Sequence, residues 1–345
     1  MNSMAGRREW LGLVVLAIPT LLVAMDVTAL FLALPRLSAD LGATGVQQLW
    51  ASDSYGFLVA GFVITMGTLG DRIGRRRLLM IGAAAFAVIS VIAARSTSLQ
   101  MLIVARGLLG IAGATLAPST LALISNMFRD GRQRGKAIAI WATCQFTGGA
   151  LGPVLAGLLL LHFWWGSVFL VSVPAMALLL VAAPILLPEY RNPTAGRLDL
   201  ASVVLSLATV LPVVYGLKQL TIAGGHDLAL PLASLVVGLA LGVVFVRRQL
   251  RLDEPLLNLR LLANRPFTAI LIAMTFAGIA MAGLGLLVTQ YLQSVLGHSP
   301  FVSALLFAPM GLGMAVGTMT APALARRVRP ATAIAGGLAL SVVGC

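Results

Sequence analysis

The chain has 345 residues, of which 59% are hydrophobic and only 10% are charged, and its mean hydropathy is +0.99. In a soluble domain, about a quarter of the residues are charged. This composition therefore excludes a soluble enzyme and leaves no room for a large extramembrane domain. The net charge of +13 would indicate nucleic-acid binding in a soluble protein. In a membrane protein, lysine and arginine residues determine the orientation of the spans.

Apolar stretches long enough to cross a bilayer follow one another along the whole chain. A spanning helix needs about 20 such residues, and short segments rich in charges or turn residues separate the stretches. The sequence therefore predicts an all-α polytopic membrane protein. Its eleven candidate spans lie near residues 11–34, 49–69, 78–94, 102–124, 136–160, 167–187, 199–217, 229–246, 267–291, 302–323 and 331–345.

The distribution of positive charge predicts how these spans are oriented. With the N-terminus in the cytoplasm, most lysine and arginine residues fall in cytoplasmic loops, and only Arg36, Arg95 and Lys218 fall in outer loops. Cytoplasmic loops of membrane proteins carry an excess of these residues. We therefore expect a multi-pass protein of the cell inner (plasma) membrane with a cytoplasmic N-terminus.

A faint internal repeat predicts two related halves. The loop after the second span and the loop after the tenth share a pattern in which Arg72 aligns with Arg326 and Arg75 with Arg329. The seventh and eighth spans are then an extra pair between the halves. We expect three parts: a six-helix N-terminal bundle (1–190), the two extra helices (191–250), and an incomplete C-terminal bundle with about three of six helices (251–345).

The most specific motif lies in the loop after the second span, and its members are Gly67, Gly70, Asp71, Arg72, Gly74, Arg75 and Arg76. The glycines allow a tight reversal and close helix approach. Asp71 can accept hydrogen bonds from a helix N-terminus, and the arginines can meet helix C-termini, carboxylates or anionic lipid. This motif resembles the signature loop of the major facilitator superfamily, which implies a latch between the two halves during alternating access.

Further motifs resemble one branch of that superfamily, the fourteen-helix drug:proton antiporters. Residues 25–35 look like their first-helix motif, Arg106 to Gly110 resembles their buried-arginine motif, and residues 253–267 look like the segment after their extra helix pair. The antiporter motif of the fifth span matches at Gly148, Gly152, Pro153 and Gly157, and it departs from the usual double glycine at Ala156. The resemblance is strongest to exporters of methyl viologen and quaternary ammonium compounds, through Trp50-x-x-Asp53-x-Tyr55 and residues 162–170.

The resemblance implies the fold and the activity. We expect a major facilitator superfamily fold of the fourteen-helix type, truncated after about eleven helices. It implies proton-coupled secondary active efflux of lipophilic cationic drugs, such as quaternary ammonium compounds, dyes and methyl viologen. The expected partners are these substrates, protons and the lipid bilayer, with no nucleic acid and no cofactor, and the protein is expected to be a monomer.

Two ionisable residues within spans, Asp26 and Arg106, are the main candidates for coupling. Each is costly in hydrocarbon unless it faces the bundle interior and finds a partner. At about 1.5 Å per residue, Asp26 lies ~24 Å above Trp10 and Arg106 roughly 9 Å below the outer start of the fourth span, so they can meet. We hypothesise that Asp26 exchanges between a proton, Arg106 and a cationic substrate. The alternative is that Arg106 reaches the outer headgroups and Asp26 is a structural carboxylate.

Residues near the outer end of the second span and in the fifth and ninth spans are candidates for lining a cavity. Asp53 is either an outer acidic site for protons or cations, or an interfacial carboxylate. Aromatic faces attract cations and amides add polarity, so the candidate cavity residues are Tyr55, Phe57, Gln145, Phe146, Gln290 and Tyr291. Cys144 and Cys345 lie in apolar runs, and the histidines lack metal spacing, so no metal site is expected.

Three other functions are alternatives to drug export. A protein with the same motifs can export an endogenous metabolite or antibiotic, and the 345-residue chain can be a fragment that does not transport. A membrane-embedded enzyme needs converging acid, base or nucleophile residues at one membrane face, which the outer loops do not offer. The chain also has no phosphate-binding Gly-x-x-x-x-Gly-Lys-Ser/Thr loop. The sequence therefore predicts a transporter that is not an enzyme and is not driven by ATP.

Overall fold

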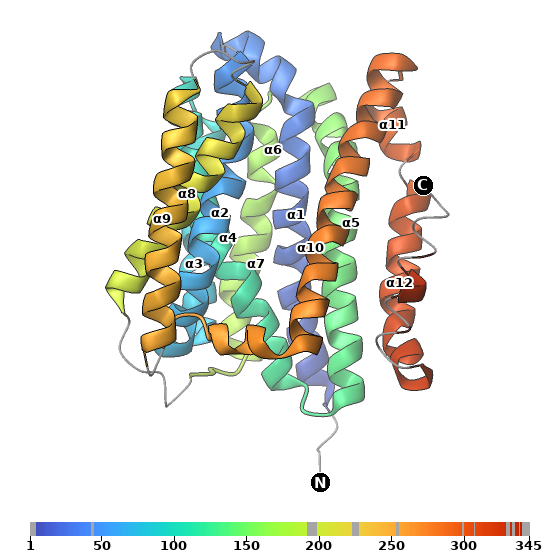
Figure 1. The fold of residues 1–345 in the computed structure, drawn as a ribbon. Helices are drawn as coiled ribbons and strands as arrows, with labels where there is room; N and C mark the ends of the chain where they lie inside the picture. The colour runs from blue at the N-terminus through green and yellow to red at the C-terminus, as the bar shows by residue number, and fades with distance from the viewer. Residues whose placement is uncertain are drawn as a thin grey trace.

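A computed structural model describes most of the chain, and every regular element in that part is a helix (Figure 1). The described residues are 5–42, 45–191, 199–222, 228–252, 255–298, 300–306, 308–328, 332, 335–337 and 339. Among them, eight helices are long and apolar enough to cross a membrane. The predicted all-α polytopic membrane protein is confirmed, while most of the eleventh candidate span, 331–345, lies outside the described residues.

Most helices follow the predicted spans and extend beyond them at one or both ends. They are α1 (Arg7–Leu41), α2 (Gly45–Ile73), α3 (Arg75–Ala94), α4 (Leu99–Met127), α5 (Gly131–His162), α6 (Ser167–Leu170), α7 (Ser172–Leu186), α8 (Leu200–Ile222) and α9 (Ala229–Arg251), followed by η1 (Leu259–Ala263), α10 (Arg265–Gln290), η2 (Tyr291–Val295), α11 (Pro300–Leu306) and α12 (Ala308–Arg327). The spans predicted near 167–187 and 302–323 are each described as two helices, α6 with α7 and α11 with α12. Apolar windows locate only the hydrocarbon-spanning turns, whereas backbone hydrogen bonding continues into the polar interface. Helix α1 accordingly continues past Pro35 to Leu41.

The N-terminal helices pack around α4. Helix α1 lies along α5, α2 and α3 lie along α4, and α7 contacts both α1 and α3. These contacts depend on glycines: a Cβ at Gly110 of α4 would overlap the Tyr55 carbonyl of α2, and one at Gly148 of α5 would overlap the Leu21 carbonyl of α1. Small residues at such crossings let backbones approach closely, as membrane helices require.

Helices α8 and α9 form an antiparallel pair beside this bundle, and α8 contacts α2 (Figure 1). On the opposite side, α11 and α12 lie against α5. In the sequence, the α8–α9 pair therefore lies between the first bundle and the last helices. In space, this pair contacts the first bundle through α2.

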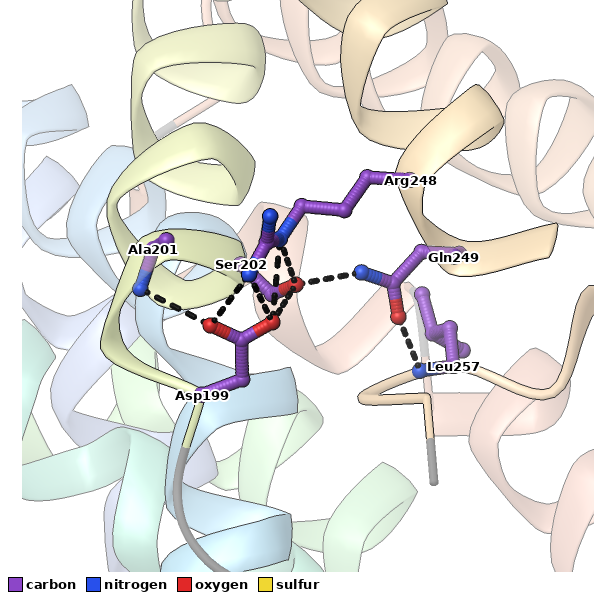
Figure 2. Close-up of polar contacts among 6 residues, drawn as sticks. All are labelled: Asp199, Ala201, Ser202, Arg248, Gln249 and Leu257. Carbon is purple, nitrogen blue, oxygen red and sulfur yellow. Dashed lines mark hydrogen bonds and ion pairs between the residues drawn. The ribbon is translucent and has the colours of Figure 1, made fainter. Parts of the chain in front are cut away.

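A polar network joins the ends of α8 and α9 to the segment that follows them (Figure 2). Asp199 accepts hydrogen bonds from the Ala201 amide (3.1 Å) and the Ser202 hydroxyl (2.7 Å), and it pairs with Arg248 of α9 (2.9 Å). Gln249, which is only 2% exposed, donates to Ser202 (2.6 Å) and accepts from the Leu257 amide (3.1 Å). The network caps α8 and fixes where the chain leaves α9.

Replacing Asp199 by alanine is expected to lower the free energy of unfolding by about 1 kcal/mol at neutral pH, because α8 loses its cap and Arg248 its partner. The hydrogen bond from Ser202, followed by those from Arg248, lowers the pKa of the Asp199 carboxyl below its usual range. A lowered folded pKa adds stability above the unfolded value of about 3.9, and that stability is lost as the pH falls through the folded value.

The measurement is the unfolding of the wild-type and Asp199→Ala chains in one detergent between neutral and acidic pH. The difference between them is expected to shrink below about pH 4. Asp199→Asn is the matched control, because asparagine also caps helices but carries no charge, and it is expected to lose less than alanine does. An equal loss in both variants, independent of pH, would contradict this account of the network.

Candidate transport site

The two ionisable residues expected within the spans form a buried ion pair between α1 and α4. Nη1 of Arg106 lies 2.6 Å from Oδ2 of Asp26, and the side chains of Arg106 and Asp26 are 0% and 3% exposed. The side chain of Arg106 therefore does not reach the outer headgroups. A hydrogen bond between two charged groups out of water is among the stronger polar contacts in a protein.

Two aromatic rings lie beside the Arg106 guanidinium. Its Cζ lies 4.8 Å from the ring centroid of Tyr55 and 5.9 Å from that of Phe169. Gly113 leaves the space for the Tyr55 ring, because a Cβ there would lie 2.5 Å from the phenol oxygen. Tyr55 was expected to line a cavity, but it is only 5% exposed and packs on Arg106 instead. Its ring holds a cation in place by cation–π attraction.

Asp26 also borders a small cavity with room for about one water molecule. The cavity lies between α1, α5 and the α6–α7 segment, and its lining includes Met25, Ala156 and Ser172. The second carboxylate oxygen of Asp26, Oδ1, is buried and has no hydrogen-bond partner among the described residues. Asp26 thus has one oxygen held by a guanidinium and one oxygen able to accept a proton.

The antiporter-motif glycines of α5 pack against the turns of α1 that flank Asp26. A Cβ at Gly148 would overlap the Leu21 carbonyl, and one at Gly152 would overlap the Thr28 hydroxyl oxygen. Pro153 lies inside the helix beside them, and Gly157 is partly buried one turn further on. The motif therefore sets the distance between α1 and α5 at the level of Asp26.

Asp53, in the third turn of α2, has a partner that the sequence did not indicate. Its Oδ2 lies 2.5 Å from Nζ of Lys218 on α8. Finding this contact requires knowing that α2 and α8 are neighbours, which hydropathy alone does not provide. The Asp53 side chain is therefore both accessible, with 49% of its surface exposed, and ion-paired with Lys218.

The loop motif between α2 and α3 is tied to the end of α7. Asp71 accepts a hydrogen bond from Nε of Arg75 (2.9 Å), and among the described residues it accepts none from a helix N-terminus, which was the expected donor. The Arg75 amide donates to the Tyr190 carbonyl (2.8 Å), and Arg76 donates to the Leu187 carbonyl (2.9 Å). The loop is therefore hydrogen-bonded to the segment that follows α7, which belongs to the N-terminal part of the chain.

The glycines of the same motif fit this arrangement. Gly74 has a φ of +108°, which side-chain-bearing residues rarely adopt, and a Cβ there would lie 2.5 Å from Oε1 of Glu189. A Cβ at Gly70 would press on the Arg75 side chain, whereas Gly67 has open space up to Pro118. Arg72, at the end of α2, is partly buried. Glu189, which also pairs with Arg76 at 3.5 Å, gave no signal in the sequence.

Among the described residues, none of the remaining cavity candidates lines the small cavity beside Asp26. Gln145 and Phe146 are exposed on α5, and Tyr291 is exposed in η2. Phe57 packs edge-on against Trp50 at 6.2 Å. The side chain of Gln290 lies outside the described residues. In the part of the chain that the structure describes, no cluster of three or more His, Cys, Asp or Glu side chains could hold a metal ion.

Comparison with protein families decides the class of protein to which this site belongs. Residues 16–345 match the family model described as Major Facilitator Superfamily. The chain belongs to this superfamily. Its members are membrane transporters, so the chain is placed among transporters and not among enzymes.

Individual relatives of this superfamily align over nearly the whole chain. The multidrug efflux pump LfrA of Mycolicibacterium smegmatis is 44% identical over 98% of this chain, which covers 66% of LfrA. The methyl viologen resistance protein SmvA of Salmonella typhimurium is 37% identical over 97% of this chain, which covers 68% of SmvA. The chain therefore spans about two thirds of the length of these relatives.

Solved structures show the same fold. The human organic anion transporter MFSD10 matches with a TM-score of 0.59 and 18% identity, covering 92% of this chain and 72% of that one. At this identity the likeness concerns the fold alone. Together with the family match it confirms the predicted major facilitator superfamily fold.

Proposed function

We propose that the protein is a proton-coupled antiporter that exports lipophilic cations, such as quaternary ammonium compounds, dyes and methyl viologen, by alternating access. The observation that carries the proposal is the buried pair of Asp26 and Arg106, with a carboxylate oxygen left for a proton. The similarity to a multidrug efflux pump and a methyl viologen resistance protein supports the class of substrate.

The geometry suggests how one carboxylate serves both proton and drug. Protonation of Asp26 removes the charge that holds Arg106, and Arg106 then rests on the Tyr55 ring 4.8 Å away. When the proton leaves, the carboxylate again attracts a positive group, either Arg106 or a cationic compound. A ligand shifts a conformational equilibrium only by its differential affinity for the two states. Competition for one carboxylate supplies that difference, since proton and drug do not bind together.

The same proposal includes the organisation of the chain in the plasma membrane. Residues 1–190 form the N-terminal bundle, 191–250 add the extra pair, and 251–345 begin the second bundle, in a fourteen-helix plan with the N-terminus in the cytoplasm. Support comes from the α8–α9 pair beside α2 and from α11 and α12 against α5. The loop motif with Asp71 and Arg75 lies at the same membrane face as Arg7, at the start of α1, and its latch role remains part of the proposal.

The test is efflux of ethidium and methyl viologen from cells that make this chain. Efflux is expected to stop when an uncoupler collapses the proton gradient, and to fall at least tenfold in Asp26→Asn, because asparagine neither titrates nor holds a cation. Asp26→Glu keeps the acid and is expected to retain part of the activity. Asp40→Asn, at the exposed end of the same helix, is the control and is expected to behave as wild type. Correct membrane insertion without efflux would contradict the proposal for this chain.

A further inference from the structure

A compact group of charged and aromatic side chains joins α2 to α8 near the end of the bundle that carries Asp53. Nζ of Lys218 lies 2.5 Å from the Asp53 carboxylate and 4.7 Å from the ring centroid of Trp50. The rings of Trp50 and Tyr215 are stacked, with centroids 5.9 Å apart and planes inclined by 28°. The ammonium of Lys218 also donates to the Leu49 carbonyl at 3.2 Å.

The spacing in sequence explains why these four side chains meet. Trp50 and Asp53 are three residues apart on α2, and Tyr215 and Lys218 are three residues apart on α8. Residues at this spacing share one face of a helix. Because α2 and α8 are neighbours, one carboxylate and the Trp50 ring contact a single ammonium, and the Tyr215 ring stacks on Trp50.

A carboxylate beside an indole face and a stacked phenol ring is a set of groups that binds organic cations. Aromatic faces attract quaternary ammonium groups, and a carboxylate adds charge complementarity. The Lys218 side chain is 15% exposed and therefore largely enclosed, whereas the Asp53 side chain is 49% exposed and can be approached from outside the protein. The ammonium of Lys218 occupies the position that such a ligand would take.

We propose that Asp53, Trp50 and Tyr215 form an outer binding site for organic ammonium and phosphonium cations, and that Lys218 is an internal cation displaced by the bound compound. The class of cation rests on the function proposed above, but binding at this site does not require transport. The site lies on α2 and α8, apart from the Asp26–Arg106 pair between α1 and α4.

An internal competitor lowers the affinity of the site without blocking it. A tethered group acts at a high effective concentration, and it returns to its place when the compound leaves. A partly exposed ion pair and one cation–π contact are individually weak, so a free cation can replace them. Lys218 therefore favours release of a compound on this side of the membrane, which gives the inserted helix pair a function in export.

The first test is equilibrium binding of tritiated tetraphenylphosphonium to the purified full chain in lipid nanodiscs. It is done in the Asp26→Asn background, so that binding at the inner carboxylate, and a failure of the proposed antiport, do not affect the result. Lys218→Gln is expected to bind the probe roughly tenfold more tightly than its parent, and Asp53→Asn roughly tenfold more weakly. Lys218→Arg keeps a cation and is expected to match the parent.

Lys136→Gln, which removes an exposed lysine near the start of α5, is the matched control and is expected to leave binding unchanged. Triphenylphosphine oxide, a neutral aromatic compound, is expected not to compete with the probe. A folded Lys218→Gln chain that binds the probe no more tightly than its parent would overturn the proposal.

The second test measures displacement directly and does not depend on a variant at the site. The lysines of the chain are Lys136 and Lys218, so labelling by an amine-reactive reagent is easily localised by mass spectrometry. Tetraphenylphosphonium is expected to increase the labelling rate of Lys218 severalfold and to leave that of Lys136 unchanged. An unchanged or reduced rate at Lys218, at probe concentrations that saturate binding, would show that Lys218 is a structural partner of Asp53 and is not displaced.

Discussion

Replacing Arg106 by methionine is expected to lower the free energy of unfolding by about 3–5 kcal/mol, because Asp26 would remain buried without its partner. The Asp26 side chain is 3% exposed, and Oδ1 already lacks a hydrogen-bond partner among the described residues. The double variant Asp26→Asn/Arg106→Met removes both charges and is expected to recover most of this loss. The measurement is denaturant-driven unfolding of the purified chains in one detergent.

Arg129, which is exposed beyond the end of α4, provides the control. Arg129→Met is expected to change stability by less than about 0.5 kcal/mol, as surface substitutions usually do. If Arg106→Met were as stable as the double variant, Asp26 would not depend on Arg106 in the folded state, and the pair could not be the exchangeable contact proposed above. Two equal single losses that simply add in the double variant would lead to the same conclusion.

The double variant also separates folding from coupling. A chain that is stable but has no titratable group at position 26 is expected to show no uncoupler-sensitive efflux. Loss of efflux in Asp26→Asn alone has two possible causes, a missing proton acceptor or a damaged bundle. Recovery of stability without recovery of efflux would leave only the first.

The sequence predicted the spans and the Asp26–Arg106 contact for the same physical reason. Hydrocarbon tolerates long apolar helices and few charges, so a carboxylate and an arginine at similar depth have few ways to be satisfied other than by each other. Helix ends were less predictable: α1 and α5 extend several residues past their apolar windows. A charged residue inside the membrane thus predicts its contact better than an apolar window predicts where a helix ends.

The other contacts of the site could not be predicted, because each depends on which helices are neighbours. The pairing of Asp53 with Lys218 requires α8 to lie against α2, and that of Arg76 with Glu189 requires the end of α7 to reach the α2–α3 loop. Apart from their charge, nothing in the sequence marked Lys218 or Glu189 as a partner. Tyr55 was predicted to line a cavity because its ring can attract a cation, and in the structure the cation on its ring is Arg106.

Replacing Gly148 by alanine is expected to destabilise the protein by about 1–3 kcal/mol, whereas the same change at the next residue, Gly149, is expected to stabilise it by about 0.5–1 kcal/mol. A Cβ at Gly148 would overlap the Leu21 carbonyl, but a Cβ at Gly149 meets nothing within 4 Å. Alanine also favours the helix over glycine, so the sign of the effect depends only on what the added methyl group contacts.

The pair of alanine variants further tests whether the α5 glycines act on Asp26 through α1. Leu21 lies little more than one turn before Asp26, so a displaced α1 would alter the Asp26–Arg106 contact of 2.6 Å. Gly148→Ala is therefore expected to reduce uncoupler-sensitive efflux, and Gly149→Ala to preserve it. If both variants exported equally well at the same expression level, close contact between α1 and α5 would matter for stability alone. Reduced efflux only in Gly148→Ala would instead show that this contact positions the carboxylate on which the proposed coupling depends.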